Sequence, residues 1–348
     1  MTRKNVLFVA LAVVMLATSC SQEENGLASS SSNSSNSKQI SIYPSVNYSR
    51  AVETSIDNLQ DFYVTAFQEG EANYMAGVKY SKSDDGYGTD AGTFFWPADD
   101  SNLHFYAYAP AKPGKEGYTF DITSTTQKME NFSPNDAAAD QQDFVYAFAK
   151  GNKTGNANDG IAIDFKHALS EITISAKNTN TAYTIEVSGV KLGGIKNKGT
   201  FTFPSYNGDG TNASWTQNSQ TGDYTTSLSE AVTLGSDVTD FSAKGNVPFM
   251  LIPQLLMSQT QASTGSYIAL KVKITTKGGQ VIYGADGESW AYVAINTDWQ
   301  MGKRYNYTLD FSNGAGQDAD GNLIISGKNI KLNVTVSGFT PEDKAVNA

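Results

Sequence analysis

The side chains that could carry out catalysis are scarce in this chain. It has one cysteine, Cys20, and two histidines, His104 and His167, which both stand in apolar stretches typical of strands. Histidines in such stretches usually pack in a core or on a sheet face, so we expect neither to act as a base or a metal ligand. The sequence contains no G-x-S-x-G, phosphate-binding loop or H-E-x-x-H motif. We therefore predict a protein that is not an enzyme and has no catalytic residue, cofactor or metal.

Three oxygen-bearing side chains near the C-terminus could in principle bind calcium. Asp318, Asp320 and Asn322 alternate along the chain, and Gly321 stands among them. In an EF-hand loop the glycine is the sixth residue, whereas here it is the fourth when counted from Asp318. A hairpin turn explains the same residues better, because Asp, Asn and Gly all favour turns.

The start of the chain has the parts of an export signal. Arg3 and Lys4 supply positive charge, and an uncharged apolar run follows at residues 6–17. This run is shorter than the about 20 apolar residues that span a bilayer, so it is typical of a signal peptide. Small residues then lead to Cys20, and we predict a signal peptide over residues 1–19.

The residues before Cys20 resemble the lipobox of bacterial lipoproteins, where signal peptidase II cuts before a cysteine whose sulfur is acylated. The usual leucine three positions before the cysteine is Ala17 here. Cleavage by the ordinary signal peptidase at the same small residues is the alternative. Cysteine usage favours acylation, because an exported chain with one cysteine has no second thiol with which to form a disulfide. We expect a lipid on Cys20.

The composition separates a tether from a folded body. Residues 21–39 are rich in Ser and Asn and offer little apolar surface to bury, so we expect a flexible tether. We predict that residues 20–50 comprise this lipidated tether and a removable first strand. The formal net charge of −10 disfavours nucleic acid and anionic membrane surfaces as partners. The 18 tyrosines and 17 phenylalanines are enough for the body to bury real cores.

From residue 39 onward, apolar and polar residues alternate, which is typical of half-buried strands. The alternation is clearest at residues 268–274 and 330–336, and clusters of Gly, Asn and Asp separate such segments. There is no long helical stripe, so we predict an all-β protein. The length suggests two β-sandwich domains in tandem, at residues 51–178 and 179–348.

Six short segments stand in order along the body: FWP (95–97), LHFYAYAP (103–110), FKHAL (165–169), GTF (199–201), LIPQ (251–254) and WQMGKRY (299–305). Together with the lipobox they resemble the Mfa-like fimbrillin family of Bacteroidetes, the subunits of protease-assembled (type V) pili. The resemblance implies two tandem sandwich domains of transthyretin-like or Greek-key topology. It also implies a structural or adhesive role, as a stalk or tip subunit, in a fimbria on the cell outer membrane.

The resemblance further implies proteolytic maturation at Arg50 and Ala51. In cleaved fimbrillins an arginine-specific surface protease cuts at such a position, and Arg50 lies between the first alternating segment and the body. Losing the first strand would leave an open sheet edge and an apolar groove, onto which a strand of another fimbrillin subunit can pair. The alternative is that the Arg-Ala pair is an ordinary, uncut part of a loop.

The last alternating segment, residues 330–336, is the second feature that could serve assembly. Its apolar positions share one face and are Ile330, Leu332, Val334 and Val336. Two interpretations remain open: the strand closes its own sandwich, or it is donated to a neighbouring subunit.

A monomeric surface lipoprotein that binds glycans is the alternative function. Trp215, Trp290 and Trp299 could stack on sugar rings if they are exposed. β-Rich chains also use such aromatic residues to fill cores and to form cross-strand pairs.

Overall fold

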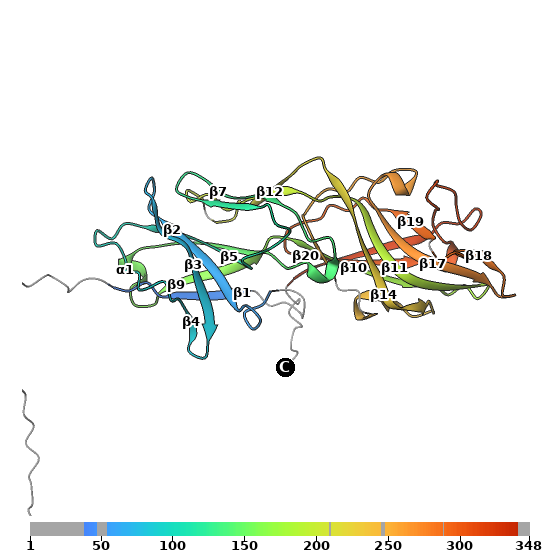
Figure 1. Ribbon diagram of the computed structural model, residues 1–348, viewed down its shortest axis with the longest axis horizontal. Coiled ribbons are helices and arrows are strands. Elements are labelled where there is room, and N and C mark those ends of the chain that lie inside the picture. Colours follow the sequence, from blue (N-terminus) through green and yellow to red (C-terminus); the bar gives the residue numbers. More distant parts are fainter. Residues whose placement is uncertain (1–37, 47–53, 209, 245–247, 288, 340–348) are drawn as a thin grey trace, which may run out of the picture. The chain divides into compact units, whose positions relative to one another are not determined.

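The computed structural model describes residues 38–46, 54–208, 210–244, 248–287 and 289–339. Cys20, Arg50 and Ala51 lie outside these residues. Almost all of the regular structure is β, as predicted (Figure 1). Within the described ranges, the helical elements are α1 (Lys153–Asn156) and the 3-10 turns η1 (Ala138–Asp140), η2 (Phe241–Lys244), η3 (Ala262–Thr264) and η4 (Phe311–Asn313).

The N-terminal half of the described chain builds a seven-stranded sheet. In spatial order its strands are β1 (Ile42–Val46), β9 (Ile161–His167), β8 (Val145–Gly151), β5 (Leu103–Ala109), β2 (Asp61–Phe67), β3 (Asn73–Ser83) and β4 (Gly86–Gly88). β1 pairs with β9 in parallel, and the other neighbours are antiparallel. Both faces of the central strand β5 are buried. Along β5, Phe105 and Ala107 belong to one apolar cluster, and Tyr106 belongs to another.

A four-stranded sheet contributes the second of these clusters. Its spatial order is β13 (Ser214–Gln217), β12 (Gly199–Thr202), β7 (Gln127–Phe132) and β6 (Thr119–Ile122). Met129 and Phe132 of β7 and Phe201 of β12 pack with Tyr106 of the seven-stranded sheet. The pairing of β12 with β7 joins strands from both sides of residue 178 into one sheet. The division into domains at residues 178 and 179 stays a prediction.

Two five-stranded sheets form a sandwich in the C-terminal half. One contains β15 (Thr239–Asp240), β10 (Ser170–Lys177), β20 (Lys303–Asp310) and β21 (Lys331–Gly338), with β16 (Phe249–Leu251) also on β10. The other contains β14 (Thr221–Thr233), β11 (Tyr183–Lys196), β17 (Tyr267–Thr276) and β18 (Val281–Tyr283), with β19 (Trp290–Ala294) also on β17.

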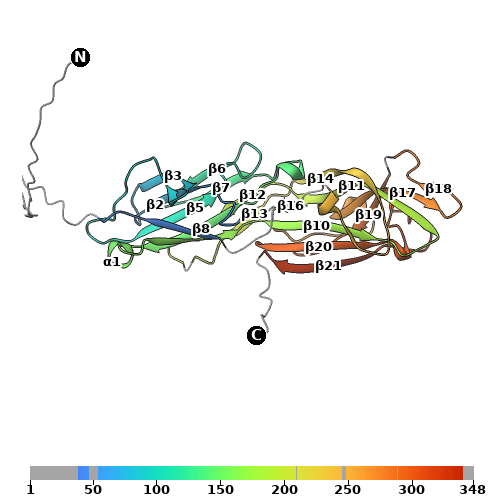
Figure 2. The same cartoon turned by 90° about the horizontal axis from the view of Figure 1, so that it is seen from below.

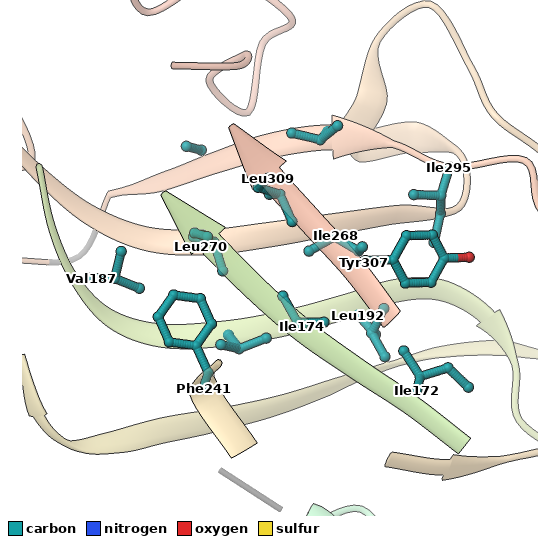
Figure 3. Packing of buried hydrophobic residues seen from close by; sticks show 14 of the residues in the cluster. Ile172, Ile174, Val187, Leu192, Phe241, Ile268, Leu270, Ile295, Tyr307 and Leu309 are labelled. Atoms are coloured by element: carbon teal, nitrogen blue, oxygen red, sulfur yellow. The ribbon is translucent and has the colours of Figure 1, made fainter. Parts of the chain in front are cut away.

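The core of this sandwich follows from strand alternation. β20 buries every second residue, and β10 runs parallel to it along seven residue pairs. Ile174 of β10 and Tyr307 of β20 pack with Val187 of β11 and Leu270 of β17 in one apolar cluster (Figure 3). In strands the side chains point alternately to the two faces, so the apolar set of each sheet meets that of the other sheet.

Candidate functional site

β1 is an edge strand of the seven-stranded sheet, and β9 is its sheet neighbour (Figure 1). The parallel register joins five residue pairs, from Ile42 with Ile161 to Val46 with Phe165. The residues just before β1 are held on the opposite side by the segment around Phe94, because the amide of Ile40 donates to the carbonyl of Phe94 at 2.8 Å. β1 is therefore a short strand tied to the body by few backbone hydrogen bonds.

The side chains of β1 and of the residue two positions before it belong to a core. Ile40, Ile42 and Val46 are 4%, 6% and 5% exposed, and they pack in one cluster with Phe62 and Trp96. These positions share a face because side chains alternate along a strand. Removing β1 would consequently strip part of the wall from an apolar core.

The outer face of β1 fixes its register against the neighbouring strand. The Tyr43 ring lies over Gly160, whose φ is +73°, and a Cβ at position 160 would come within 2.3 Å of Tyr43 Cε2. The Ser45 hydroxyl donates to the Asp164 carboxylate. A glycine is required at position 160 for two reasons, the left-handed backbone and the close approach of the ring.

A cavity of about 730 Å³ lies beside β1 and is also lined by residues of β4, the opposite edge of the same sheet. Ile42 of β1 and Tyr87 of β4 both contribute to its wall, together with Ile56 and Tyr80. The sheet therefore curls enough to bring its two edges to one cavity. Unpaired strand edges beside an apolar core are the kind of site that accepts an added strand.

β21 is the edge of a different sheet, and Figure 2 shows it beside β20. The two strands pair in antiparallel fashion along eight residue pairs, from Lys303 with Gly338 to Asp310 with Lys331. In this structure, then, β21 closes the sheet of its own chain. Among the described strands, β20 is its sheet partner.

The apolar face of β21 is covered along half of its length. Ile330, just before the strand, is buried and Leu332 packs partly against the core, whereas Val334 and Val336 are 42% and 50% exposed. The apolar residues alternate along the sequence as expected, but the burial of this face falls from Ile330 to Val336, where the side chains are only about half covered by described residues. An edge strand with an uncovered apolar face is a ready surface for another chain.

Both histidines are buried, as their apolar setting predicts. His104 lies among aromatic rings, with Tyr206 at 5.1 Å between centroids, and burial lowers the pKa of its imidazole. His167 Nδ1 lies 2.7 Å from Asp143 Oδ2. Sequence reasoning did not find Asp143, because nothing in the chain marks a pair that is 24 residues apart.

Asp318 belongs to a turn. Its carboxylate accepts hydrogen bonds from the amides of Asp320 at 3.0 Å and Asn322 at 2.9 Å. Burial raises the pKa of Asp318, but the hydrogen bonds from Asn322 and its neighbours outweigh burial and leave the pKa below its ordinary value. Within the described ranges, no group of three or more His, Cys, Asp or Glu residues is placed to hold a metal ion.

Three of the four tryptophans, those that could stack on sugar rings if exposed, are engaged in packing. Trp299 is 1% exposed and its indole N–H donates to the Tyr307 hydroxyl at 3.0 Å. The indole N–H of Trp215 donates to the carbonyl of Ala168 at 2.7 Å. The Nζ of Lys191 lies 4.4 Å from the centre of the Trp290 ring. Trp299 is thus closed to sugar, and Trp215 and Trp290 are half-buried against other residues.

The family model described as fimbrillin-like matches residues 49–338. The chain belongs to the fimbrillin-like family. This family comprises fimbrial and cell-adhesion subunits, and it is not a family of enzymes. The matched region begins after β1 and ends with the last residue of β21, so β1 precedes the part of the chain that the fimbrillin model describes.

A search of solved structures finds similar proteins from Bacteroides and Porphyromonas. A protein of Bacteroides ovatus described as a cell adhesion protein is 16% identical, with a TM-score of 0.49 over 88% of this chain and 100% of that chain. A similarly described protein of Bacteroides uniformis is 15% identical, with a TM-score of 0.47 over 88% and 99% of the two chains. The fimbrial anchor protein Mfa2 of Porphyromonas gingivalis is 11% identical, with a TM-score of 0.33 over 86% and 98%. A search of curated protein sequences finds no match.

No helix within the described ranges is both long and apolar enough to cross a membrane.

Proposed function

We propose that this fimbrillin is a structural and adhesive subunit, a stalk or tip subunit, of a fimbria on the cell outer membrane. It is exported as a lipoprotein through Cys20, cut after Arg50 by an arginine-specific surface protease, and joined to other fimbrillin subunits by strand donation. The observation that carries the proposal is β1: it comes before Arg50 in the chain, pairs as an edge strand, and fills a core.

The energetics support β1 as a strand that another chain can replace. Three side chains, Ile40, Ile42 and Val46, leave the core together when the segment before Arg50 departs. At about 1.5–3 kcal/mol each, their removal exposes about 5–9 kcal/mol of gross apolar transfer free energy. It also frees the edge of β9 to pair with another strand. An incoming strand that restores both contributions forms a contact that dissociates slowly.

β21 has the features expected of the donated strand. Its inward positions, with Ile330 just before it, fall at four alternate residues, and the inward positions from Ile40 to Val46 span the same length. Among the described residues of the single subunit, Val334 and Val336 stay about half exposed. Transfer into the groove left by β1 would bury them. The precursor keeps β21 on its own β20, and the finished fibre places it on a neighbour.

Treatment of the purified full chain with an arginine-specific protease tests the proposal. We expect N-terminal sequencing to find Ala51 and gel electrophoresis without heating to show a ladder of multimers. The matched control is Arg50→Lys, which keeps the positive charge but removes the cleavage site. A second variant, Val334→Glu with Val336→Glu, is expected to be cut at the same rate and to form no ladder. A full ladder from the Arg50→Lys chain, or cleavage that leaves only monomers, would contradict the proposal.

A further inference from the structure

Asp143 and His167 are two buried ionisable side chains at the seven-stranded sheet that lie outside both edge strands, β1 and β21. Asp143 precedes β8 and His167 ends β9. The side chains are 1% and 6% exposed, and His167 Nδ1 lies 2.7 Å from Asp143 Oδ2. Burying such a pair costs free energy, and the other contacts of the two side chains must offset that cost.

The Asp143 carboxylate also holds the start of the chain that follows the predicted cut. The amide of Thr54 donates to Asp143 Oδ2 at 2.9 Å. Oδ2 therefore accepts hydrogen bonds from both Thr54 and His167, while Asp143 Oδ1 and His167 Nε2 are buried without a hydrogen-bond partner. The two polar side chains thus depend on one shared oxygen for most of the compensation for their burial.

The other side of His167 meets the residue that follows β21. The rings of His167 and Phe339 lie edge to face, with centroids 4.5 Å apart and an interplanar angle of 69°. Phe339 is 4% exposed, and its amide donates to the carbonyl of Gly302 at 3.2 Å. The end of the C-terminal strand is consequently fastened against the histidine that Asp143 orients.

The charge of Asp143 also affects Glu171, a residue of the sheet that contains β21. Glu171 of β10 forms a bidentate pair with Arg304 of β20, with Nη2 to Oε2 at 3.0 Å, and Arg304 lies opposite Ser337 of β21. Burial raises the pKa of Glu171 to about 8, and the nearby carboxylate of Asp143 adds to that rise. Removing the Asp143 charge changes the electrostatic surroundings of this ion pair as well.

We propose that Asp143 and His167 couple the segment beginning at Thr54 to the C-terminal strand β21, so that loosening one loosens the other. Asp143 Oδ2 links the two ends. When the Thr54 amide leaves this oxygen, the Asp143 carboxylate is held less firmly and orients His167 less firmly. The His167 ring then supports the Phe339 ring less well. The biological meaning rests on the proposed function, because a cut after Arg50 frees the chain three residues before Thr54. The coupling keeps β21 docked in the precursor and lets it be released after maturation.

Hydrogen exchange on the uncut full chain tests the coupling without protease or assembly. The two readouts are the amides of Thr54 and Phe339, which are the hydrogen-bond donors at the two ends of the network. We expect Asp143→Asn to raise the exchange rates of both amides by about tenfold or more. Because coupling free energies are reciprocal, Phe339→Leu, which touches only the C-terminal end, should also speed exchange at Thr54.

The matched control is Asp61→Asn. Asp61 is a nearby carboxylate that pairs with Lys79 of β3 and not with His167. It should leave both amides unchanged. Combining Asp143→Asn with Phe339→Leu should give less than the product of the two single effects. Fast exchange at Thr54 with an unchanged Phe339 amide, or fully independent effects in the double variant, would overturn the coupling. If Asp143→Asn fails to fold, Phe339→Leu alone decides the question. None of these outcomes depends on whether Arg50 is cut.

Discussion

The two edge strands that bracket the fimbrillin body hold to it in opposite ways. β1 has five residue pairs with β9, but three inward side chains of its segment are fully inside a core. β21 has eight residue pairs with β20, yet two of its valines are open to solvent. Both strands are paired along their whole length, but β1 is shorter and has buried inward side chains, while β21 is longer and has inward valines that are half exposed. Under the proposed function, loss of β1 would open a groove in an apolar core, and β21 would be the strand that fills it.

The largest difference between the two edges should appear when their apolar side chains are shortened. Ile40→Ala with Ile42→Ala leaves cavities in a closed core, and each change should cost about 2–4 kcal/mol. Urea unfolding followed by tryptophan fluorescence should show a loss of about 4–8 kcal/mol in the free energy of unfolding. A loss below about 1 kcal/mol would mean that β1 is not part of the core, and the comparison would fail.

A second prediction concerns the buried pair Glu171 and Arg304, which joins β10 to β20, the strand that pairs with β21. Burial raises the pKa of Glu171 to about 8 from 4.5, and the contact with Arg304 works against this rise. A carboxyl whose pKa is raised by folding stabilises the fold fully below pH 4.5, and this contribution is lost as pH rises through about 8. From pH 5 to pH 8 the free energy of unfolding should therefore fall.

Glu171→Gln is the variant that isolates this slope, because it keeps the shape of the side chain and removes its titration. Urea titrations across the same pH range should be flatter in Glu171→Gln than in the parent chain. An equally steep dependence in the variant would assign the slope to other groups.

A third prediction sharpens the account of β1 through its outer face. Gly160→Ala forces a Cβ into the Tyr43 ring and places alanine at φ +73°, so it should cost about 1–3 kcal/mol and loosen β1. Gly279→Ala is the matched control, since Gly279 has φ +87° and nothing within 4 Å of an added Cβ. The difference between the two variants in the free energy of unfolding measures the close contacts at position 160, which are with the Tyr43 ring and the Ser41 carbonyl. Equal losses of stability would show that these contacts contribute nothing.

The smallest effect is expected at the other edge. Val334→Ala with Val336→Ala removes methyl groups that are about half exposed, so the unfolding free energy of the monomer should fall by only about 1–2 kcal/mol. The same double variant should weaken assembly clearly, because these side chains would be buried only in the fibre. A large loss of monomer stability would show that β21 is packed into its own sandwich.

Local patterns in the sequence predicted the strands well. The alternation at residues 268–274 marked β17, because successive side chains of a strand point to opposite faces and the pattern is therefore local. The alternation before and after Val334 also marked β21. It did not show that half of this face is uncovered, since coverage depends on which strands lie opposite.

The features that depend on distant partners could not be derived. The parallel pairing of β1 with β9 joins residues 119 positions apart, and the pairing of β12 with β7 crosses the predicted domain division. Asp143 and Glu171 carry no local motif that would announce their partners His167 and Arg304, which lie 24 and 133 residues away. Such contacts are set by topology, which alternation does not encode.

Hydrogen exchange of the β9 backbone tests the central claim most directly, because β9 is the strand that β1 covers. We expect the amides of Ile161–His167 on the side facing β1 to be protected in the uncut chain. They should become exposed in the Val334→Glu, Val336→Glu chain after cutting, when neither β1 nor a donated strand covers them. In assembled multimers of the otherwise unaltered chain they should be protected again. Protection that persists after cutting in the assembly-deficient variant, or exposure that persists in the multimers, would contradict the account.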